Sequence, residues 1–406
     1  MSVHTPDNGS GPRVAFVTNL CPHYRTKTFE TLAKYCQMDY YFFSGGEEWY
    51  LWGGHRKRDG DFNYEYLPGI DLAGTRLSPT LPVKLWRGNY DVFLKCINGR
   101  FALPITYAVA RMRRKPFILW TGLWTNLRSP FHWMFFPLTR YVYRHADAIV
   151  VYGEHVKRYM IDQGVEAARV FIAAHAVDNS IYSRHVPDDE IKKLRAELNI
   201  GENDRVVLYV GRLEESKGLN YLVEAFASIE QKDVVLLFVG EGSQTTLIQR
   251  TVSELGLADR VRFVGYVAPE NTVPYYALSY VSILPSVSMP QGKELWGLVV
   301  NEAMNQGVPV IATDVVGAAA GGLVQDGTNG LVVPERNGPA LADALRKMID
   351  SPVLRDQMSN HARQIIAGWD NENMVQGFRR AIKFVTKATE RHMALSVPSR
   401  STRKVE

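Results

Sequence analysis

Short apolar runs alternate with amphipathic segments along most of the chain. Runs such as 13–18, 116–121 and 206–211 are rich in β-branched and aromatic residues, which is typical of buried strands. Over 218–230, by contrast, apolar residues recur at helical spacing. This alternation of strand-like and helix-like segments predicts parallel sheets covered by helices, and therefore an α/β fold.

Two such series follow one another, which predicts two doubly wound, Rossmann-like domains. The first series has expected strands at 13–18, 38–44, 91–96, 116–121 and 147–152, and helices near 25–36, 101–114, 131–145 and 153–163. The second has expected strands at 206–211, 234–240, 261–265, 281–286 and 309–314, and helices near 218–230, 243–256, 297–306, 338–350 and 353–367. Turn formers without a clear period make 173–190 the expected linker. We predict domains over 1–183 and 184–369, a last helix at about 370–390 and a disordered tail over 391–406.

The composition is that of a soluble globular protein, with 46% hydrophobic and 22% charged residues among 406. The three cysteines, Cys21, Cys36 and Cys96, form no CxxC pair, which argues against a disulfide framework or a zinc site. The polar start of the sequence lacks the apolar core of a signal peptide, and no apolar run approaches the length of a membrane span. We therefore expect a cytoplasmic protein.

Positive charge is concentrated in the first half of the chain. Residues 1–185 hold 23 Lys and Arg against 15 Asp and Glu, whereas the remainder holds 24 against 27. A basic half suits an anionic acceptor or an anionic membrane surface, although ordinary surface variation explains it equally well. The segments 110–115 and 129–144 combine cations with aromatic residues, which indicates either peripheral membrane contact or helix packing on the sheet. No nucleic-acid-binding motif is present.

Two cations directly follow a predicted buried strand. Arg212 and Lys217 come after the strand 206–211 and before a helix, so they should lie at the carboxyl edge of the sheet, where ligands bind. Arginine can hold a phosphate through two parallel hydrogen bonds, and lysine supplies a mobile positive charge. Alternatively, both are solvated loop cations.

Two glutamates stand eight residues apart in an otherwise apolar stretch. Glu294 lies in a predicted loop, and Glu302 lies more than a turn inside a helix predicted to begin at Gly297–Leu298. The free amides of Gly297, Leu298 and Val299 should form an anion site at the helix start. Carboxylates accept hydrogen bonds from sugar hydroxyls, which suits Glu302 for a ribose and Glu294 for a second sugar. Alternatively, Glu294 is a surface residue and Glu302 pairs with a cation.

The order of these motifs resembles one enzyme family. GRL-x4-KG, VGEG, VRFVGYV, LPS, E-x7-E and QGVPVIATD follow each other between Val206 and Val333 as in the retaining glycosyltransferases of family 4, which have the GT-B fold. The N-terminal half is similar to that family more weakly, through 16–33, 146–160 and 176–178. The resemblance implies two facing Rossmann-like domains with a cleft between them.

The resemblance also implies roles for individual residues. Arg212 and Lys217 would hold the donor diphosphate, Glu302 the nucleotide ribose and Glu294 the transferred sugar. Glu241 and the backbone near Tyr266 and Val267 would complete the donor site, where this backbone would contact the nucleotide base. Trp369 would mark the point where the chain crosses back, so the last helix would pack on the N-terminal domain.

The implied reaction transfers a sugar from a UDP-, GDP- or ADP-sugar to a carbohydrate or lipid-linked acceptor with retention, without a cofactor or metal. The leaving diphosphate would accept the proton of the acceptor, and Arg212 and Lys217 would stabilise its charge. Two alternatives stay open, a nucleotide-sugar epimerase or hydrolase of the same fold and a non-catalytic nucleotide-binding scaffold. A DxD string at 59–61 is interpreted as a turn rather than a metal motif.

One part of the family pattern is missing. Many members carry a histidine two residues after a threonine on the N-terminal side of the cleft, but here Gly122 and Leu123 follow Thr121. Three nearby residues are the candidate substitutes on the acceptor side, namely Thr121, Trp124 and Asn126. His23 and Arg25 from the first loop are further candidates for the same place.

Overall fold

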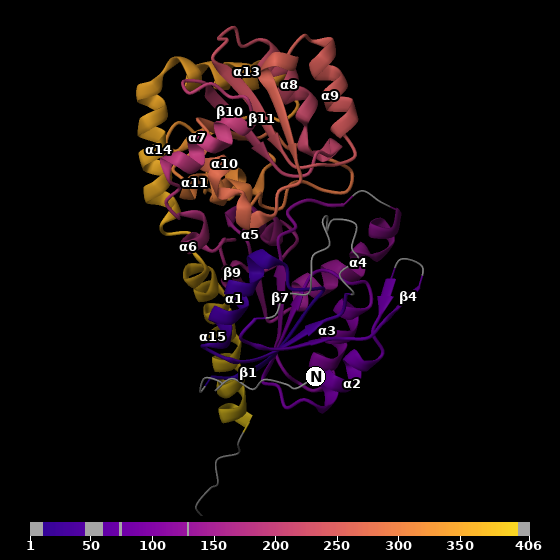
Figure 1. Cartoon of the computed structure of the whole chain (residues 1–406). Coiled ribbons are helices and arrows are strands. Elements are labelled where there is room, and N and C mark those ends of the chain that lie inside the picture. The colour runs from indigo at the N-terminus through magenta and orange to yellow at the C-terminus, as the bar shows by residue number, and fades with distance from the viewer. Residues whose placement is uncertain (1–10, 45–59, 73–74, 128–129, 397–406) are drawn as a thin grey trace, which may run out of the picture.

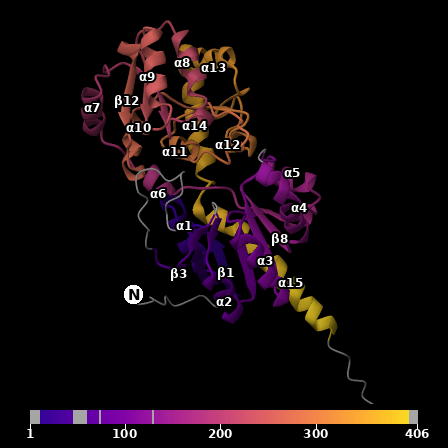
Figure 2. The same ribbon diagram turned by 90° about the vertical axis from the view of Figure 1, so that its right-hand side faces the viewer.

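Two parallel β-sheets, one in each half of the chain, form the framework of the protein (Figure 1). The computed structural model describes residues 11–44, 60–72, 75–127 and 130–396. Figure 2 shows the same two lobes from the side, with the last helix running along the lower lobe. The expected α/β class and the two doubly wound sheets are confirmed.

The first sheet has the strand order β3-β2-β1-β6-β7-β8-β9, and all of its pairs are parallel. Its strands are β1 (Arg13–Thr18), β2 (Gln37–Phe42), β3 (Asn63–Tyr66), β6 (Val92–Cys96), β7 (Phe117–Thr121), β8 (Ala148–Val151) and β9 (Val170–Ile172). Its helices are α1 (His23–Ala33), α2 (Thr80–Arg87), α3 (Ala102–Met112), α4 (Pro130–His145) and α5 (Glu154–Asp162). A small antiparallel pair, β4 (Ile70–Leu72) and β5 (Thr75–Leu77), lies outside this sheet.

Helices cover both faces of the first sheet because its strands are apolar on both sides. Phe117 and Trp120, three residues apart in β7, point to opposite faces. The Phe117 ring lies edge-on to Tyr107 of α3, and the Trp120 ring contacts Phe378 of the last helix. The sheet is therefore the middle layer between α3 and the C-terminal helix.

The second sheet has the order β12-β11-β10-β13-β14-β15 and is also entirely parallel. Its strands are β10 (Arg205–Val210), β11 (Val234–Val239), β12 (Val261–Gly265), β13 (Val281–Leu284), β14 (Val310–Thr313) and β15 (Gly330–Val333). Its α-helices are α7 (Asp188–Glu197), α8 (Leu219–Ala227), α9 (Thr245–Glu254), α10 (Val273–Leu278), α11 (Val299–Asn305), α12 (Gly317–Ala320), α13 (Gly338–Asp350) and α14 (Pro352–Ile366).

The chain crosses between the two halves twice. The first crossing contains the short helix α6 (Asn179–Tyr182), and α7 begins at Asp188, so the expected linker 173–190 is partly helical. The second crossing leads into α15 (Asn371–Ser396), which contacts α1 and the first sheet. Asn371 fixes this return, since its amide donates to the Val177 carbonyl and its Oδ1 accepts from Thr28. The domain limits at 183 and 369 stay predictions.

Several short elements differ from the sequence-based expectation. The pattern did not predict β3, α2, β9, α10 or β15, each of which has eight residues or fewer. Residues 391–396, expected in the disordered tail, continue α15, because Ala, Met and Leu there favour helix. Residues 397–406 and Asp59 of the DxD string lie outside the described residues, while Gly60 and Asp61 precede β3 without regular structure.

Candidate functional site

Both sheets have a topological switch point beside their first strand. In the first sheet β1 lies between β2 and β6, and in the second sheet β10 lies between β11 and β13. At such points the loops after the two inner strands diverge to opposite faces and leave a crevice at the carboxyl edge. The candidate site is therefore built from the loops that follow β1 and β6 in one half and β10 and β13 in the other.

A glycine holds the two loops of the second half together. Gly218 has φ 60°, and a Cβ at this position would lie 2.3 Å from the backbone oxygen of Pro285. The amide of Val287 also donates to the Ser216 carbonyl at 2.9 Å. Because the loop after β10 is held against the loop after β13, Lys217 reaches the residues that follow β13.

Lys217 forms an ion pair with Glu294, and Ser286 Oγ donates to the same carboxylate oxygen at 3.1 Å. Burial acts to raise the pKa of Glu294, but the charge and hydrogen bond of Lys217, the Ser286 bond and the charge of Arg212 outweigh it, so the pKa is lowered. The Lys217 and Glu294 side chains keep 15% and 19% exposure, so a ligand can reach this pair. Glu294 is thus an ionised carboxylate between two cations.

Arg212 is held by residues of its own loop. Its guanidinium donates to Glu214 at 3.2 Å, and its backbone oxygen accepts from the Tyr209 hydroxyl at 2.7 Å. The two cations and two carboxylates, Arg212 with Glu214 and Lys217 with Glu294, balance each other in charge. An anionic ligand must therefore compete with these carboxylates for the cations.

Glu302 lies deeper than the other charged residues of the site. It is 8% exposed, and its Oε2 accepts a hydrogen bond from Tyr276 of α10 at 2.7 Å. Burial raises the pKa of Glu302 to about 7 despite the hydrogen bonds it accepts. Because α11 begins at Val299 rather than at Gly297, Glu302 belongs to the first turn of the helix and not to its interior.

The other predicted donor residues lie beyond the carboxyl ends of β11, β12 and β13. Gly297, with φ 88°, packs against the Leu284 side chain. Leu298 caps α11, which begins at Val299. Glu241 follows β11 and accepts from the Tyr266 amide at 3.2 Å, next to Val267. The structure therefore brings Glu241 and the 266–267 backbone together at the ends of β11 and β12.

The five residues predicted on the acceptor side have different surroundings. Arg25 is buried, donates to the Tyr152 hydroxyl at 2.8 Å and lies over the Trp120 ring. Trp124 Nε1 donates to the backbone oxygen of Glu294 at 3.0 Å, so it connects the two halves. Thr121 is buried and accepts from the Leu123 amide, Asn126 is exposed and accepts from Tyr159, and His23 is half-buried at the start of α1.

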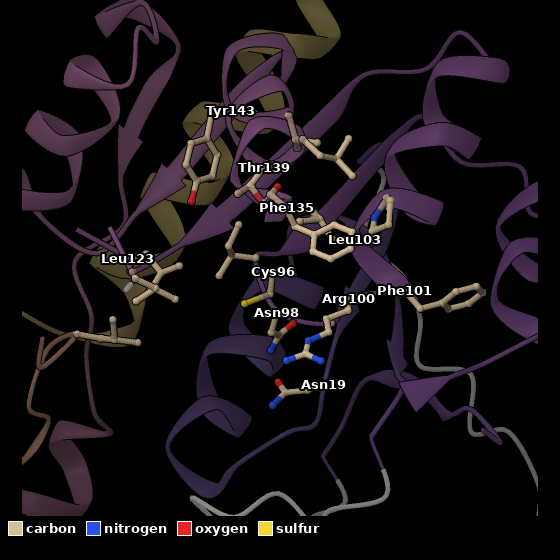
Figure 3. A pocket seen from close by; sticks show the side chains of 18 of the residues that line it. Asn19, Cys96, Asn98, Arg100, Phe101, Leu103, Leu123, Phe135, Thr139 and Tyr143 are labelled. Atoms are coloured by element: carbon tan, nitrogen blue, oxygen red, sulfur yellow. Dashed lines mark hydrogen bonds between the residues drawn. The ribbon is translucent and has the colours of Figure 1, made fainter. Parts of the chain in front are cut away.

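A cavity of about 840 Å³ lies at the switch point of the first sheet (Figure 3). Asn19 follows β1, and Asn98 and Arg100 follow β6, so these three side chains come from the two diverging loops. Sequence reasoning did not select them, although their positions directly after predicted strands offered the same signal that selected Arg212. Leu295 lines the cavity from the other half of the chain.

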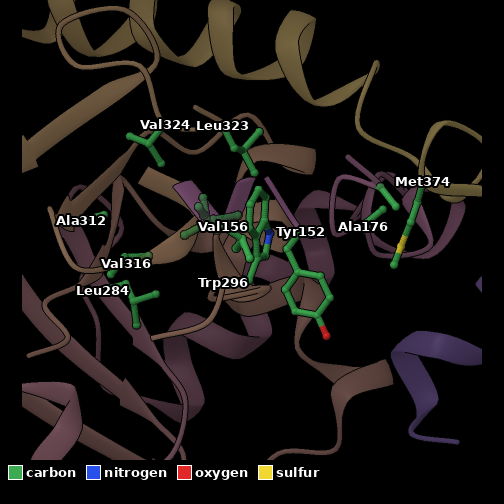
Figure 4. Close-up of a cluster of buried hydrophobic side chains, with 14 of the residues drawn as sticks. Tyr152, Val156, Ala176, Leu284, Trp296, Ala312, Val316, Leu323, Val324 and Met374 are labelled. Carbon is green, nitrogen blue, oxygen red and sulfur yellow. The ribbon is translucent and has the colours of Figure 1, made fainter. Parts of the chain in front are cut away.

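Aromatic rings pack between the two halves beside this cavity. Trp296 stacks on Trp369 at 5.5 Å, and His155 contacts both Trp124 and Trp296. Figure 4 shows Trp296 among Tyr152, Val156 and Leu323. Burial lowers the pKa of His155 to about 4, which makes this ring neutral near pH 7. The family's histidine is thus absent after Thr121, but another histidine from α5 lies at the boundary between the halves.

The described part of the chain contains neither a cluster of metal-binding side chains nor a helix that could span a membrane. There, no three His, Cys, Asp or Glu side chains gather in a way that could hold a metal ion. Among the same residues, every helix is too short or too polar to cross a bilayer. The expectation that no metal is required stays a prediction.

A known protein family matches much of the second half of the chain. Residues 190–365 match the family described as glycosyl transferases group 1. This matched segment, called the group 1 domain below, is less than half of the chain and contains all the predicted donor residues, from Arg212 to Glu302.

Curated relatives of the chain are glycosyltransferases. Alpha-D-kanosaminyltransferase of Streptomyces kanamyceticus is 31% identical over 241 residues, which cover 57% of this chain and 59% of the relative. D-inositol 3-phosphate glycosyltransferase of Corynebacterium aurimucosum is 29% identical over 236 residues, 54% of this chain and 53% of the relative. The chain therefore spans little more than half the length of these relatives.

Solved structures confirm the fold of both halves together. HepE of Anabaena, crystallised in complex with UDP, superimposes with a TM-score of 0.72 over 91% of this chain and 99% of its own, at 21% identity. The chain thus has the GT-B glycosyltransferase fold, as the resemblance implied. Membership of family 4 in particular stays a prediction.

Proposed function

We propose that the chain is a glycosyltransferase that moves a sugar from a nucleotide-sugar donor to an acceptor hydroxyl. The observation that carries the proposal is the group formed by Arg212, Lys217 and Glu294 at the switch point of the group 1 domain. Two cations suit a diphosphate, and the partly exposed carboxylate suits the hydroxyls of the sugar. The cavity at the other switch point, with Leu295 in its wall, supplies the acceptor side.

In the proposed reaction, the bond between the anomeric carbon and the donor diphosphate breaks while the acceptor oxygen attacks from the same face. The acceptor proton passes to the leaving diphosphate oxygen. Arg212 and Lys217 stabilise the charge that develops there, and Glu294 stabilises the positive sugar ring. Retention and these residue roles are part of the proposal, as is the placement of Glu302 on the ribose.

Donor binding tests this proposal. Purified protein is heated with UDP-, GDP- and ADP-sugars in turn, because a ligand that binds the native state raises the melting temperature. UDP-sugars come first, since the HepE neighbour was crystallised with UDP. We expect the sugars of one of these nucleotides to raise the melting temperature, and Lys217→Met to abolish that rise. If none of the three nucleotide sugars raises the melting temperature, the proposed function is wrong.

Product analysis separates the proposal from an epimerase or hydrolase of the same fold. With donor alone, we expect slow release of free sugar, and no isomerised nucleotide sugar. Rapid and complete conversion without any acceptor would favour the alternative activity.

We further infer that the protein is cytoplasmic and contacts a membrane peripherally through α4. Trp133 and Met134 of this helix are 82% and 66% exposed, and Arg140 and Arg144 follow on the same helix. Exposed aromatic residues beside cations favour the interface of an anionic bilayer.

A further inference from the structure

The cavity beside the first sheet is apolar along most of its wall. Its lining includes Leu103, Phe135, Phe136, Leu138 and Val142, from α3 and α4. With about 840 Å³ it is large enough for a whole ligand rather than for a few waters. A wall of this kind stabilises an apolar body by removing it from water, whereas a free glycan would leave the hydroxyls that face this wall without partners.

The charged residues of the cavity all have one sign. Arg25 and Arg100 line it, and no aspartate or glutamate does so among the residues that the structure describes. Figure 3 shows Asn19, Asn98 and Arg100 on one side of the cavity and Leu103 with Phe135 on the other. The cavity is therefore amphipathic, with a cationic and amide side that suits an anionic head group.

The cavity also extends from exposed residues of α4 to the sequence neighbour of a donor-site residue. On the inner side Leu295 lines it, and the neighbouring Glu294 belongs to the donor site. On the outer side Phe135 and Leu138 are 43% and 49% exposed, although both line the cavity. The exposed Trp133 lies on the same helix. An apolar path thus runs from the exposed face of α4 to the residue next to Glu294.

We propose that the acceptor is an anionic lipid taken from a membrane surface, whose chain occupies this cavity. Its head group carries both the negative charge, near Arg25 and Arg100, and the hydroxyl that receives the sugar. The assignment of this ligand as acceptor rests on the proposed function, whereas its binding to the cavity can be measured without any donor.

The test uses 11-(dansylamino)undecanoic acid, a fluorescent anionic amphiphile, with dansylglycine as the chain-free control. We expect a saturable fluorescence rise with the amphiphile only. Phe135→Asp should weaken its binding at least tenfold, because the carboxylate enters the cavity wall, while Trp133→Asp on the same helix should leave the affinity unchanged. Equal effects of the two variants, or equal binding of dansylglycine, would overturn the assignment of the cavity.

Two further arms test the charge and the source of the ligand. Dodecyl phosphate should displace the probe at least tenfold better than dodecyltrimethylammonium, and equal displacement would show that the head group need not be anionic. Uptake of the probe from phosphatidylglycerol vesicles should be slower for Trp133→Asp than for the unaltered chain, and equal rates would exclude the membrane as the source.

The donor melting-temperature shift, measured on the same variants, keeps the two proposals separate. Phe135→Asp should keep this shift, which also shows that the variant is folded. Probe binding without a donor-induced rise in melting temperature would contradict the proposed glycosyltransferase function but not the lipid-binding cavity. A donor-induced rise without probe binding would contradict the lipid-binding cavity but not the proposed function.

Discussion

The ammonium group of Lys217 contacts the carboxylate of Glu294, although 77 residues separate them in the sequence. If Glu294 stabilises the positive sugar ring, Glu294→Gln should lower kcat by about 100-fold or more, the typical effect of removing one transition-state contact. Lys217→Met should lower both kcat and donor affinity, because it removes a cation from the diphosphate. Steady-state kinetics and calorimetric donor titration measure these two effects.

The matched control for this pair is Arg205→Met. Arg205 also forms an ion pair, with Asp233, but it stands at the start of β10, at the opposite end of the strand from the site. It should leave kcat and donor affinity unchanged. Unaltered turnover in Glu294→Gln would show that this carboxylate is not catalytic.

A second prediction concerns the ion pair that holds Arg212 before the donor arrives. Glu214 accepts from Arg212 at 3.2 Å and thereby competes with a diphosphate for the guanidinium. Glu214→Gln should therefore raise donor affinity by up to about fivefold, since a partly exposed pair is worth roughly 1 kcal/mol or less. Calorimetric titration checks this value. A lower affinity in Glu214→Gln would indicate that Glu214 positions Arg212 rather than restrains it.

The raised pKa of Glu302 should make the stability of the chain depend on pH. Burial raises its pKa to about 7 from 4.5, so between these pH values the folded state holds a proton that the unfolded chain has released. The free energy of unfolding should consequently fall as the pH rises through this window. Glu302→Gln removes the effect. The free energy of unfolding of this variant, taken relative to that of the unaltered chain, should therefore rise by up to about 3 kcal/mol between pH 4.5 and pH 8, at 1.36 kcal/mol per pKa unit.

Denaturant unfolding of the donor-free chain at pH 5 and pH 8 measures this difference. The same variant should bind the donor more weakly at pH 8, where a carboxylate would otherwise accept from the ribose hydroxyls. A stability difference that does not change with pH would mean that Glu302 titrates normally in the folded state.

The long elements and the positions of Arg212 and Lys217 could be predicted from the sequence because their signals are local. A buried strand shows as an apolar run, and a cation that follows the run must lie at the carboxyl edge of the sheet. This reasoning places Arg212 and Lys217 at that edge, where the structure also has them. The 310 turn at Glu215–Lys217 and the left-handed Gly218, which direct Lys217 toward Glu294, were not predicted.

Contacts between distant segments could not be predicted in the same way. One partner of Glu302 is Tyr276 of α10, a six-residue helix too short to show a period. The large cavity depends on the distance between α3, α4 and the first sheet, and the register of one helix on another leaves no local signal. Similarly, the start of α7 was not predicted, because its charged sequence after Pro187 does not resemble a buried helix. The helix therefore begins inside the expected linker.

Trp124 offers a test of the contact between the two halves. Its Nε1 donates to the Glu294 backbone oxygen at 3.0 Å, while its ring contacts His155 and the ammonium of Lys293. Trp124→Phe keeps an aromatic ring, which is smaller, and removes the Nε1 donor. A single hydrogen bond contributes about 1 kcal/mol, so we expect kcat to fall about fivefold with donor affinity unchanged.

The control for this variant is Trp86→Phe, which changes a half-exposed tryptophan of α2 outside the candidate site. Small-angle scattering should show a larger radius of gyration for Trp124→Phe than for this control. Identical scattering and identical kcat would mean that the bond does not hold the halves together.

The last prediction concerns the exposed face of α4. Trp133 and Tyr141 are 82% and 50% exposed on a helix whose last turn contains Arg144, so both apolar insertion and attraction to anionic lipid contribute to binding. The chain should float with phosphatidylglycerol vesicles in a density gradient at low salt, and less at 1 M salt, where charges are screened. Trp133→Ser should reduce flotation at both salt concentrations, because it removes the apolar contribution. A chain that stays at the bottom of the gradient with anionic vesicles at low salt would show that α4 does not bind membranes.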